Sequence, residues 1–125
     1  MPSRTAFVLA AAIAAVPATT FADSSGSAGS VISVTVLESS SDDYGSYRGK
    51  IVIREGTEPS ATQTEYRWGG TICANRNLSE SNIALLVEAL RGRSDTQVLP
   101  RYKMGQAGIR CLVSFTLQEP VYVAR

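Results

Sequence analysis

Few side chains in this sequence could do chemistry on their own. The 125 residues include no His and two cysteines, Cys73 and Cys111. Without His the chain cannot form a Ser-His-Asp or Cys-His catalytic site, a His-ligated zinc site or a His-based pH switch. The sequence also lacks a phosphate-binding loop, a dinucleotide-binding glycine motif and a nucleophile elbow. Composition therefore removes most enzyme classes before the fold is considered.

The carboxylates offer the remaining route to catalysis or metal binding. Asp42 and Asp43 are adjacent in a Ser-rich stretch, residues 39–47. A general acid needs a raised pKa, which requires burial or a rigid neighbouring negative charge, and a polar loop supplies neither. The two carboxylates could bind calcium weakly, but the spacing of a calcium-binding loop is missing. We interpret this stretch as a solvated turn and expect no metal and no cofactor.

The two cysteines have a structural interpretation. They are far apart in the chain and form no C-x-x-C motif, so a redox-active pair has no support. In an oxidising compartment two remaining cysteines pair by default, and we expect a Cys73–Cys111 disulfide. On the chain-entropy model a loop of this length would add roughly 4 kcal/mol of stability.

The N-terminal residues resemble an export signal in their pattern. Arg4 precedes an apolar run over residues 6–16, and residues 20–22 give a small–x–small cleavage site. We predict a signal peptide over residues 1–22, with an N-terminal core helix as the alternative. The product would be soluble in the periplasm or outside the cell, with no membrane span after cleavage.

Removing the signal changes the charge balance. Arg4 is one of 12 basic residues, so 11 remain against 11 acidic residues. A chain with zero formal charge lacks the positive field that general nucleic-acid binding requires. Residues 23–30 are Ser- and Gly-rich, and we expect a flexible tail there, followed by one small domain over residues 31–125.

The clearest element is a helix over residues 80–91. Four apolar residues recur at i, i+3, i+4 and i+7: Ile83, Leu86, Val87 and Leu90. Ser79 is placed to cap the first turn, and Gly92 could close the helix in the left-handed conformation. A helix this short needs a sheet to cover its apolar face.

Alternation and turn residues predict the strands. The expected ranges are residues 31–38, 49–55, 64–73, 96–104 and 109–117, and residues 121–123 could add a last strand. In the first of these Ile32, Val34 and Val36 share one face. We therefore predict an α+β domain: a small antiparallel sheet in the order β-β-β-α-β-β, with one helix packed on one face.

Two features could bind a partner. The hairpin loop at residues 105–108 would set Lys103 opposite Arg110, so that Arg101, Lys103 and Arg110 project from one outer face. Such a face is either solvated, paired with Glu65 or Glu38 within the fold, or used for an anionic partner.

Trp68 is the second feature. Beside Gly69 and Gly70 it could present a flat apolar surface next to open backbone, or it could be the largest core residue. Our leading hypothesis is an exported, disulfide-bonded protein-binding or inhibitor-like module that acts on another protein in the envelope or outside the cell. The alternative is a small-ligand or glycan binder using Trp68 and nearby arginines. A carboxylate-dependent hydrolase ranks third.

Overall fold

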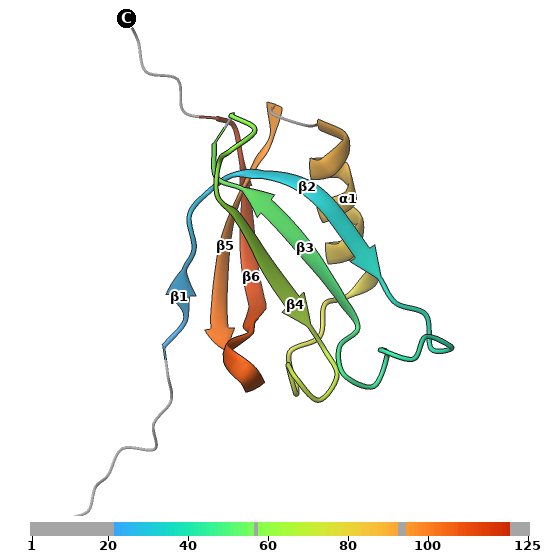
Figure 1. Ribbon diagram of the computed structural model, residues 1–125. Coiled ribbons are helices and arrows are strands. Elements are labelled where there is room, and N and C mark those ends of the chain that lie inside the picture. The colour runs from blue at the N-terminus through green and yellow to red at the C-terminus, as the bar shows by residue number, and fades with distance from the viewer. Residues whose placement is uncertain (1–21, 57, 93–94, 121–125) are drawn as a thin grey trace, which may run out of the picture.

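The described chain forms one helix and a coiled six-stranded sheet (Figure 1). The computed structural model describes residues 22–56, 58–92 and 95–120. Its elements are β1 (Ser24–Ser25), β2 (Ser30–Val36), β3 (Gly49–Arg54), β4 (Gln63–Trp68), α1 (Glu80–Gly92), β5 (Gln97–Met104), the short 3-10 helix η2 (Gln106–Gly108) and β6 (Arg110–Gln118). The α+β class is confirmed. Except for Ala22, the predicted signal peptide lies outside the described residues, as does the strand at 121–123.

The sheet is mixed, so the prediction of an antiparallel sheet is wrong in this respect. The strands follow the order β1-β5-β6-β4-β3-β2, and β4 and β6 run parallel at the Arg67–Cys111 pair. The reason lies in the connection after β4. The chain crosses through α1 to β5, two positions away, and the hairpin then returns β6 into the gap beside β4.

The N-terminal segment belongs to the sheet, and the prediction of a flexible tail is wrong for the residues described there. Ser24 and Ser25 pair with β5, and the Gly26 N–H donates to the Pro100 carbonyl at 2.9 Å. Gly29 then exchanges two backbone hydrogen bonds with Val98. Because β2 follows at once and pairs with β3, this continuous stretch joins β5 to β3 and closes the sheet on itself.

Bulges shift the predicted faces. The β2–β3 register shifts between Val31 and Ser33, and Val31, not Ile32, is buried in the core. A bulge puts two residues of one strand opposite one of its neighbour, so alternation across it is interrupted. Beyond the bulge, Val34 packs against the core and Val36 is half exposed. The prediction is therefore wrong for Ile32, whereas Val34 and Val36 still share a face beyond the bulge.

The hairpin of β5 and β6 was predicted, but its register was not. Met104 pairs with Arg110, and Lys103 pairs with Cys111, so the expected pairing of Lys103 with Arg110 is wrong. The turn is one residue longer than expected, with Ala107 and Gly108 both at positive φ. A second shift follows at Arg101/Tyr102, and it restores the apolar residues of β6 to the inner side.

The helix is close to its prediction. The N–H of Asn82 donates to the Ser79 hydroxyl at 3.2 Å, which confirms the cap. Leu86 and Ala89 are buried, and Ile83 and Leu90 pack against the same core. Gly92 remains within α1 and is not among the residues with positive φ, so the predicted left-handed end is wrong. No helix in the described ranges is long and apolar enough to span a membrane.

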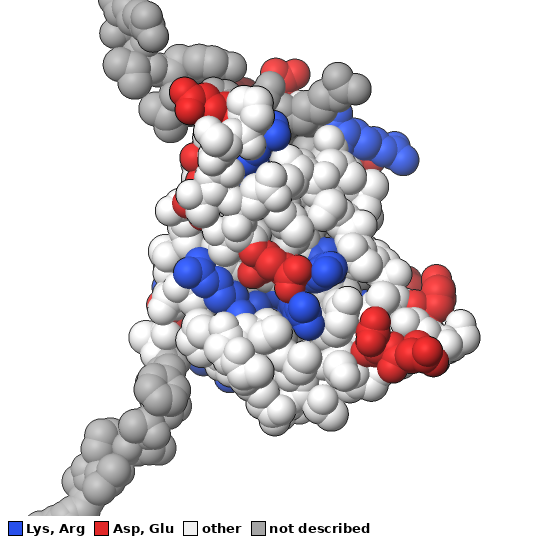
Figure 2. Space-filling view, in the orientation of Figure 1, with Lys and Arg blue, Asp and Glu red and all other residues white. Residues whose placement is uncertain are grey.

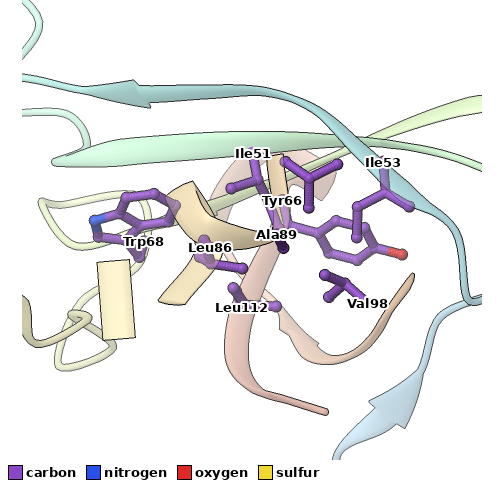
Figure 3. Packing of buried hydrophobic residues seen from close by; sticks show 9 residues of the cluster. Ile51, Ile53, Tyr66, Trp68, Leu86, Ala89, Val98 and Leu112 are labelled. Carbon is purple, nitrogen blue, oxygen red and sulfur yellow. The ribbon is translucent and has the colours of Figure 1, made fainter. Parts of the chain in front are cut away.

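The core lies between the coiled sheet and α1 (Figure 3). Trp68 and Tyr66 are its largest side chains, and both come from β4. Gly49 of β3 lies opposite Trp68, and a Cβ built there would be 2.3 Å from the indole ring and 2.6 Å from the Thr35 carbonyl oxygen. The absent side chain of Gly49 is therefore what makes room for the indole.

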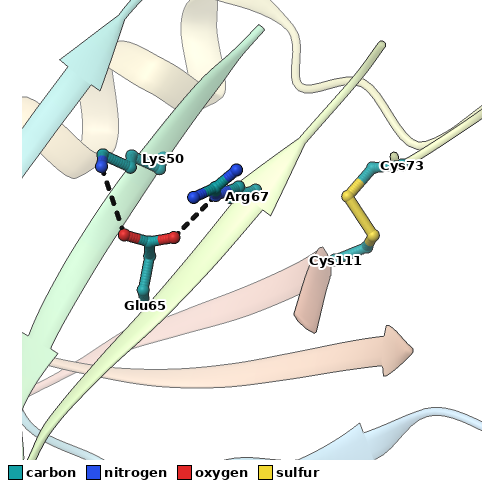
Figure 4. A network of polar contacts seen from close by, with 5 residues as sticks. All are labelled: Lys50, Glu65, Arg67, Cys73 and Cys111. Atoms are coloured by element: carbon teal, nitrogen blue, oxygen red, sulfur yellow. Dashed lines mark hydrogen bonds and ion pairs between the residues drawn. A yellow bond between two sulfur atoms is a disulfide. The ribbon is translucent and has the colours of Figure 1, made fainter. Parts of the chain in front are cut away.

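Three loops meet at one end of the sheet. The Cys73–Cys111 disulfide is present, with Cα atoms 5.6 Å apart (Figure 4). The N–H of Ile72 donates to the Ser46 carbonyl at 3.0 Å, and the N–H of Gln106 donates to the Ile72 carbonyl at 3.2 Å. The β2–β3 loop, the β4–α1 connection and the β5–β6 turn are thus joined by covalent and backbone bonds.

The burial of neighbouring leucines on α1 gives a first test. Leu86 is 0% exposed and Leu85 is 45% exposed. We expect Leu86→Ala to lower the free energy of unfolding by about 2–5 kcal/mol, because it leaves a cavity. Leu85→Ala should cost less than about 1 kcal/mol. Urea denaturation measures both, and equal losses would contradict the orientation of α1.

The contact of Gly49 with Trp68 gives a second test. Gly49→Ala should lower the free energy of unfolding by about 1–3 kcal/mol, because the methyl group must displace the indole or the Thr35 backbone. Gly45→Ala is the matched control, since a Cβ there meets nothing within 4 Å. Thermal unfolding followed by Trp fluorescence checks both variants. A Gly49→Ala protein as stable as the control would show that the indole is packed elsewhere.

Candidate functional site

Trp68 does not lie on a surface. Its side chain is 1% exposed and packs with Ile51, Leu86 and Leu112 in the core cluster (Figure 3). Of the two interpretations of Trp68, the structure matches the core one. The small-ligand or glycan alternative therefore loses the aromatic surface on which it depended.

Arg101 and Lys103 lie together, as predicted, but they face a carboxylate of the same chain. Asp23 Oδ1 is 3.6 Å from Lys103 Nζ, and Asp23 Oδ2 is 4.0 Å from Arg101 Nε. Arg101 also donates to the Asp23 carbonyl at 3.4 Å. Asp23, the residue expected to begin the processed chain, thus forms ion pairs with both Arg101 and Lys103. These contacts link the residue before β1 to β5, and the Arg101 and Lys103 side chains remain 49% and 32% exposed.

Arg110 lies apart from that pair. Its guanidinium carbon is 4.8 Å from the centre of the Tyr102 ring and 5.9 Å from that of Tyr66. The observed register pairs Arg110 with Met104 and not with Lys103. The structure therefore separates Arg110 from Arg101 and Lys103, and brings it to a groove beside β4 that also contains Glu65.

A charge network that the sequence reasoning missed lies on the outer side of β3 and β4. Lys50 Nζ is 3.2 Å from Glu65 Oε1, and Arg67 Nε is 2.6 Å from Glu65 Oε2 (Figure 4). The three side chains are 21–36% exposed. Lys50 pairs with Arg67 across the strands, so two cations would repel each other here without Glu65 between them.

Tyrosines order the arginines near this network. The Arg67 guanidinium lies 4.4 Å from the Tyr47 ring centre, and Arg48 lies 3.9 Å from that of Tyr44. Arg48 also donates through Nε to the Tyr44 carbonyl at 2.9 Å. Stacking on an aromatic ring fixes the guanidinium plane and leaves its edge donors available.

We name Lys50, Glu65, Arg67, Arg110 and Tyr47 the β4 charged face. Three cations and one carboxylate give this set a local excess of positive charge. Figure 2 shows blue side chains around a red one near the middle of the view, over β3 and β4. A separate red group lies over the loop between β2 and β3, where Asp42 and Asp43 are exposed. Positive and negative charges thus occupy different parts of the surface.

The sequence held a signal for part of this face. Glu65 and Arg67 alternate with the buried Tyr66 and Trp68, so their shared outer side could be predicted. Their position opposite Lys50 depends on the β3–β4 register, which no local pattern gives. Tyr44 and Tyr47 lay in a stretch that we interpreted as a solvated turn.

The described residues show no second arrangement that suggests chemistry. No group of three or more Cys, Asp or Glu among them is placed to hold a metal ion. No family model, no curated protein and no solved structure matches this chain. The function is therefore argued from the geometry of the β4 charged face.

The Glu65 network gives a prediction for pH. Partial burial raises the pKa of Glu65, but Arg67 and Lys50 together outweigh this effect and hold the pKa below its ordinary value of 4.5. Since the folded protein has the lower pKa, the contribution of Glu65 to stability is complete above that value and is lost as the pH falls through the folded pKa. The difference in unfolding free energy between wild type and Glu65→Gln should be at most about 1 kcal/mol at neutral pH, because the carboxyl is partly solvated.

Urea denaturation at several values between about pH 7 and about pH 3 measures this difference. It should be constant near neutrality and shrink in acid. Glu58→Gln, a change at an exposed loop position, controls for the loss of one carboxylate. A difference that grows in acid, or that matches the control throughout, would contradict the network.

Proposed function

We propose that this protein is an exported, disulfide-bonded module that binds another protein, of the inhibitor-like kind that acts by contact. The β4 charged face is its contact surface. The observation that carries the proposal is that Lys50 and Arg67 flank the carboxylate of Glu65, with Tyr47 stacked on Arg67, while Arg110 lines the same groove as Glu65. Arg and Tyr are enriched among the residues that dominate protein interfaces.

The order of these side chains supports the proposal. Binding costs the conformational freedom of each side chain that becomes fixed, and side chains already held in place lose less. Arg67 is held on both sides, by Glu65 at 2.6 Å and by the Tyr47 ring. The loop that carries Tyr47 is itself fixed to the β4–α1 connection by backbone hydrogen bonds, such as that between Ile72 and Ser46.

The sign of the charge indicates the partner. The β4 charged face has an excess of positive charge, although the processed chain would be neutral as a whole. Electrostatic complementarity favours an acidic patch on the partner, and it affects association rate and specificity more than affinity. A secreted or periplasmic location is compatible with the Cys73–Cys111 disulfide, since such bonds persist in oxidising compartments.

The proposal can be tested by capture from an envelope extract with the immobilised protein. We expect Lys50→Gln combined with Arg67→Gln to abolish recovery of a partner that wild type captures, because the change removes the excess of positive charge on the β4 charged face. Arg91→Gln is the matched control, since Arg91 lies on α1 with a side chain 74% exposed. Captured proteins are compared by mass spectrometry after thermal unfolding has shown that each variant is folded.

Salt provides a further check on the same capture. Recovery by wild type should fall as the ionic strength rises, because the screening length shrinks from about 10 Å at 0.1 M to about 3 Å at 1 M. If the double variant recovers every protein as well as wild type at low salt, the β4 charged face is merely solvated. Turnover that is abolished by Asp42→Asn in a folded protein would also overturn a function by contact.

A further inference from the structure

A groove separates the first half of β4 from the tip of the β5–β6 hairpin. Its volume is about 470 Å³, and Gln63, Thr64, Glu65 and residues 107–110 line it. It exists because β4 and β6 are paired only at Arg67 and Cys111 within the described sheet, so the chain segments before that pair diverge. Ala107 and Gly108, which line the groove on the side of the hairpin tip, both have positive φ.

Arg110 is the cation in this groove that has no ion pair. Among the described residues its side chain forms no salt bridge, whereas Arg67, Arg91 and Arg101 each have a carboxylate partner. Arg48, Arg54 and Arg76 also lack one in the described ranges, but they do not line the groove. The Tyr66 hydroxyl lies within reach of Arg110: burial raises the pKa of that hydroxyl, and a hydrogen bond from Arg110 opposes the shift. The half-buried guanidinium of Arg110 lies over the Tyr102 ring, and its remaining donors are the ones that a further acceptor would meet.

Glu65 lies in the same groove but is already engaged. One carboxylate oxygen faces Lys50 and the other accepts from Arg67 at 2.6 Å. The hydroxyl of Thr64 also has an acceptor, since it donates to Glu55 at 2.6 Å. The groove therefore keeps the positive charge of Arg110, with the exposed Gln63 amide as a further donor on its wall.

We propose that Arg110 forms a carboxylate-binding subsite, which receives an Asp or Glu side chain of the partner in this groove. The planar guanidinium donates two parallel hydrogen bonds to such a carboxylate, a geometry that an ammonium group cannot reproduce. The inference rests on the proposed function and makes it more specific, since it names the group recognised and the position that recognises it. The acidic side chain would enter beside β4, and the rest of the partner would lie over Lys50 and Arg67.

The subsite can be tested without knowing the partner. The probe is a synthetic hexaglutamate peptide with blocked ends, titrated into the isotopically labelled protein while the arginine Nε–H resonances are followed by NMR. The resonance of Arg110 is identified as the one missing in Arg110→Lys. We expect it to shift saturably with the glutamate peptide and to remain unchanged with a blocked hexaglutamine peptide.

The variants provide the comparison. Arg110→Lys keeps the charge but loses the planar pair of donors, and it should weaken peptide binding by about tenfold. Arg101→Gln, which removes an arginine already paired with Asp23, should bind as wild type does. No saturable shift at Arg110 would overturn the subsite, and so would an equal shift produced by inorganic phosphate at the same ionic strength.

Failure of the Arg110 subsite can be told apart from failure of the proposed function. If Arg110→Lys captures the protein partner as well as wild type while the variant at Lys50 and Arg67 does not, the subsite is wrong and the contact surface stands. If wild type captures no protein at all, the proposed function fails. The peptide titration still decides whether Arg110 recognises a carboxylate.

Discussion

The closure of the sheet by the N-terminal stretch is the constraint on which the rest of the fold depends. Residues 24–29 lie along β5, and β2 follows without a break along β3. These two strands would otherwise have open edges, which are templates for unwanted pairing. Closure also places Tyr66 and Val98 inside the ring, where α1 completes the core (Figure 3). The position of each outer side chain follows from this curvature.

The Ser- and Gly-rich composition of residues 24–29 fits either a flexible linker or a closely packed strand, and the sequence analysis chose the linker. Ser- and Gly-rich residues with nothing to bury are typical of a linker. Here the glycines allow close packing. A Cβ at Gly29 would lie 2.2 Å from the Arg54 carbonyl oxygen, and one at Gly26 would lie 2.1 Å from the Tyr66 hydroxyl. The need for small residues at these positions comes from partners that are distant in sequence, so no local pattern reveals it.

Local periodicity predicted what depends on local forces. The helix and its Ser79 cap appear where expected, because a helix satisfies its hydrogen bonds within a few residues. Five of the expected strands appear as β2 to β6, although β4 ends at Trp68 and not at residue 73, and β1 was not predicted. The disulfide was predictable from composition, since only two cysteines were present. Register was not predictable in the same way. The shifts at Val31/Ser33 and at Arg101/Tyr102 each change which side chains share a side, and they arise from pairing across the sheet.

The candidate site shows why it matters for function that strand register could not be predicted. The predicted basic residues were grouped by an assumed hairpin register, and the observed register leaves Arg101 and Lys103 with Asp23 and moves Arg110 to the groove beside β4. The outer sides of Glu65 and Arg67 could be predicted from alternation, whereas their meeting with Lys50 required the β3–β4 pairing.

The neutral charge that processing of the predicted signal peptide would leave therefore describes the surface poorly. Asp23 and Glu65 each compensate two cations at close range, while the exposed Asp42 and Asp43 lie in the β2–β3 loop (Figure 2). Fields from charges separated in this way cancel at a distance but remain strong within a screening length of about 10 Å at 0.1 M salt. A partner would meet little long-range attraction and a strong local preference for one orientation. Such a surface favours recognition by specific contact over non-specific binding to polyanions, which depends on net charge and long-range steering.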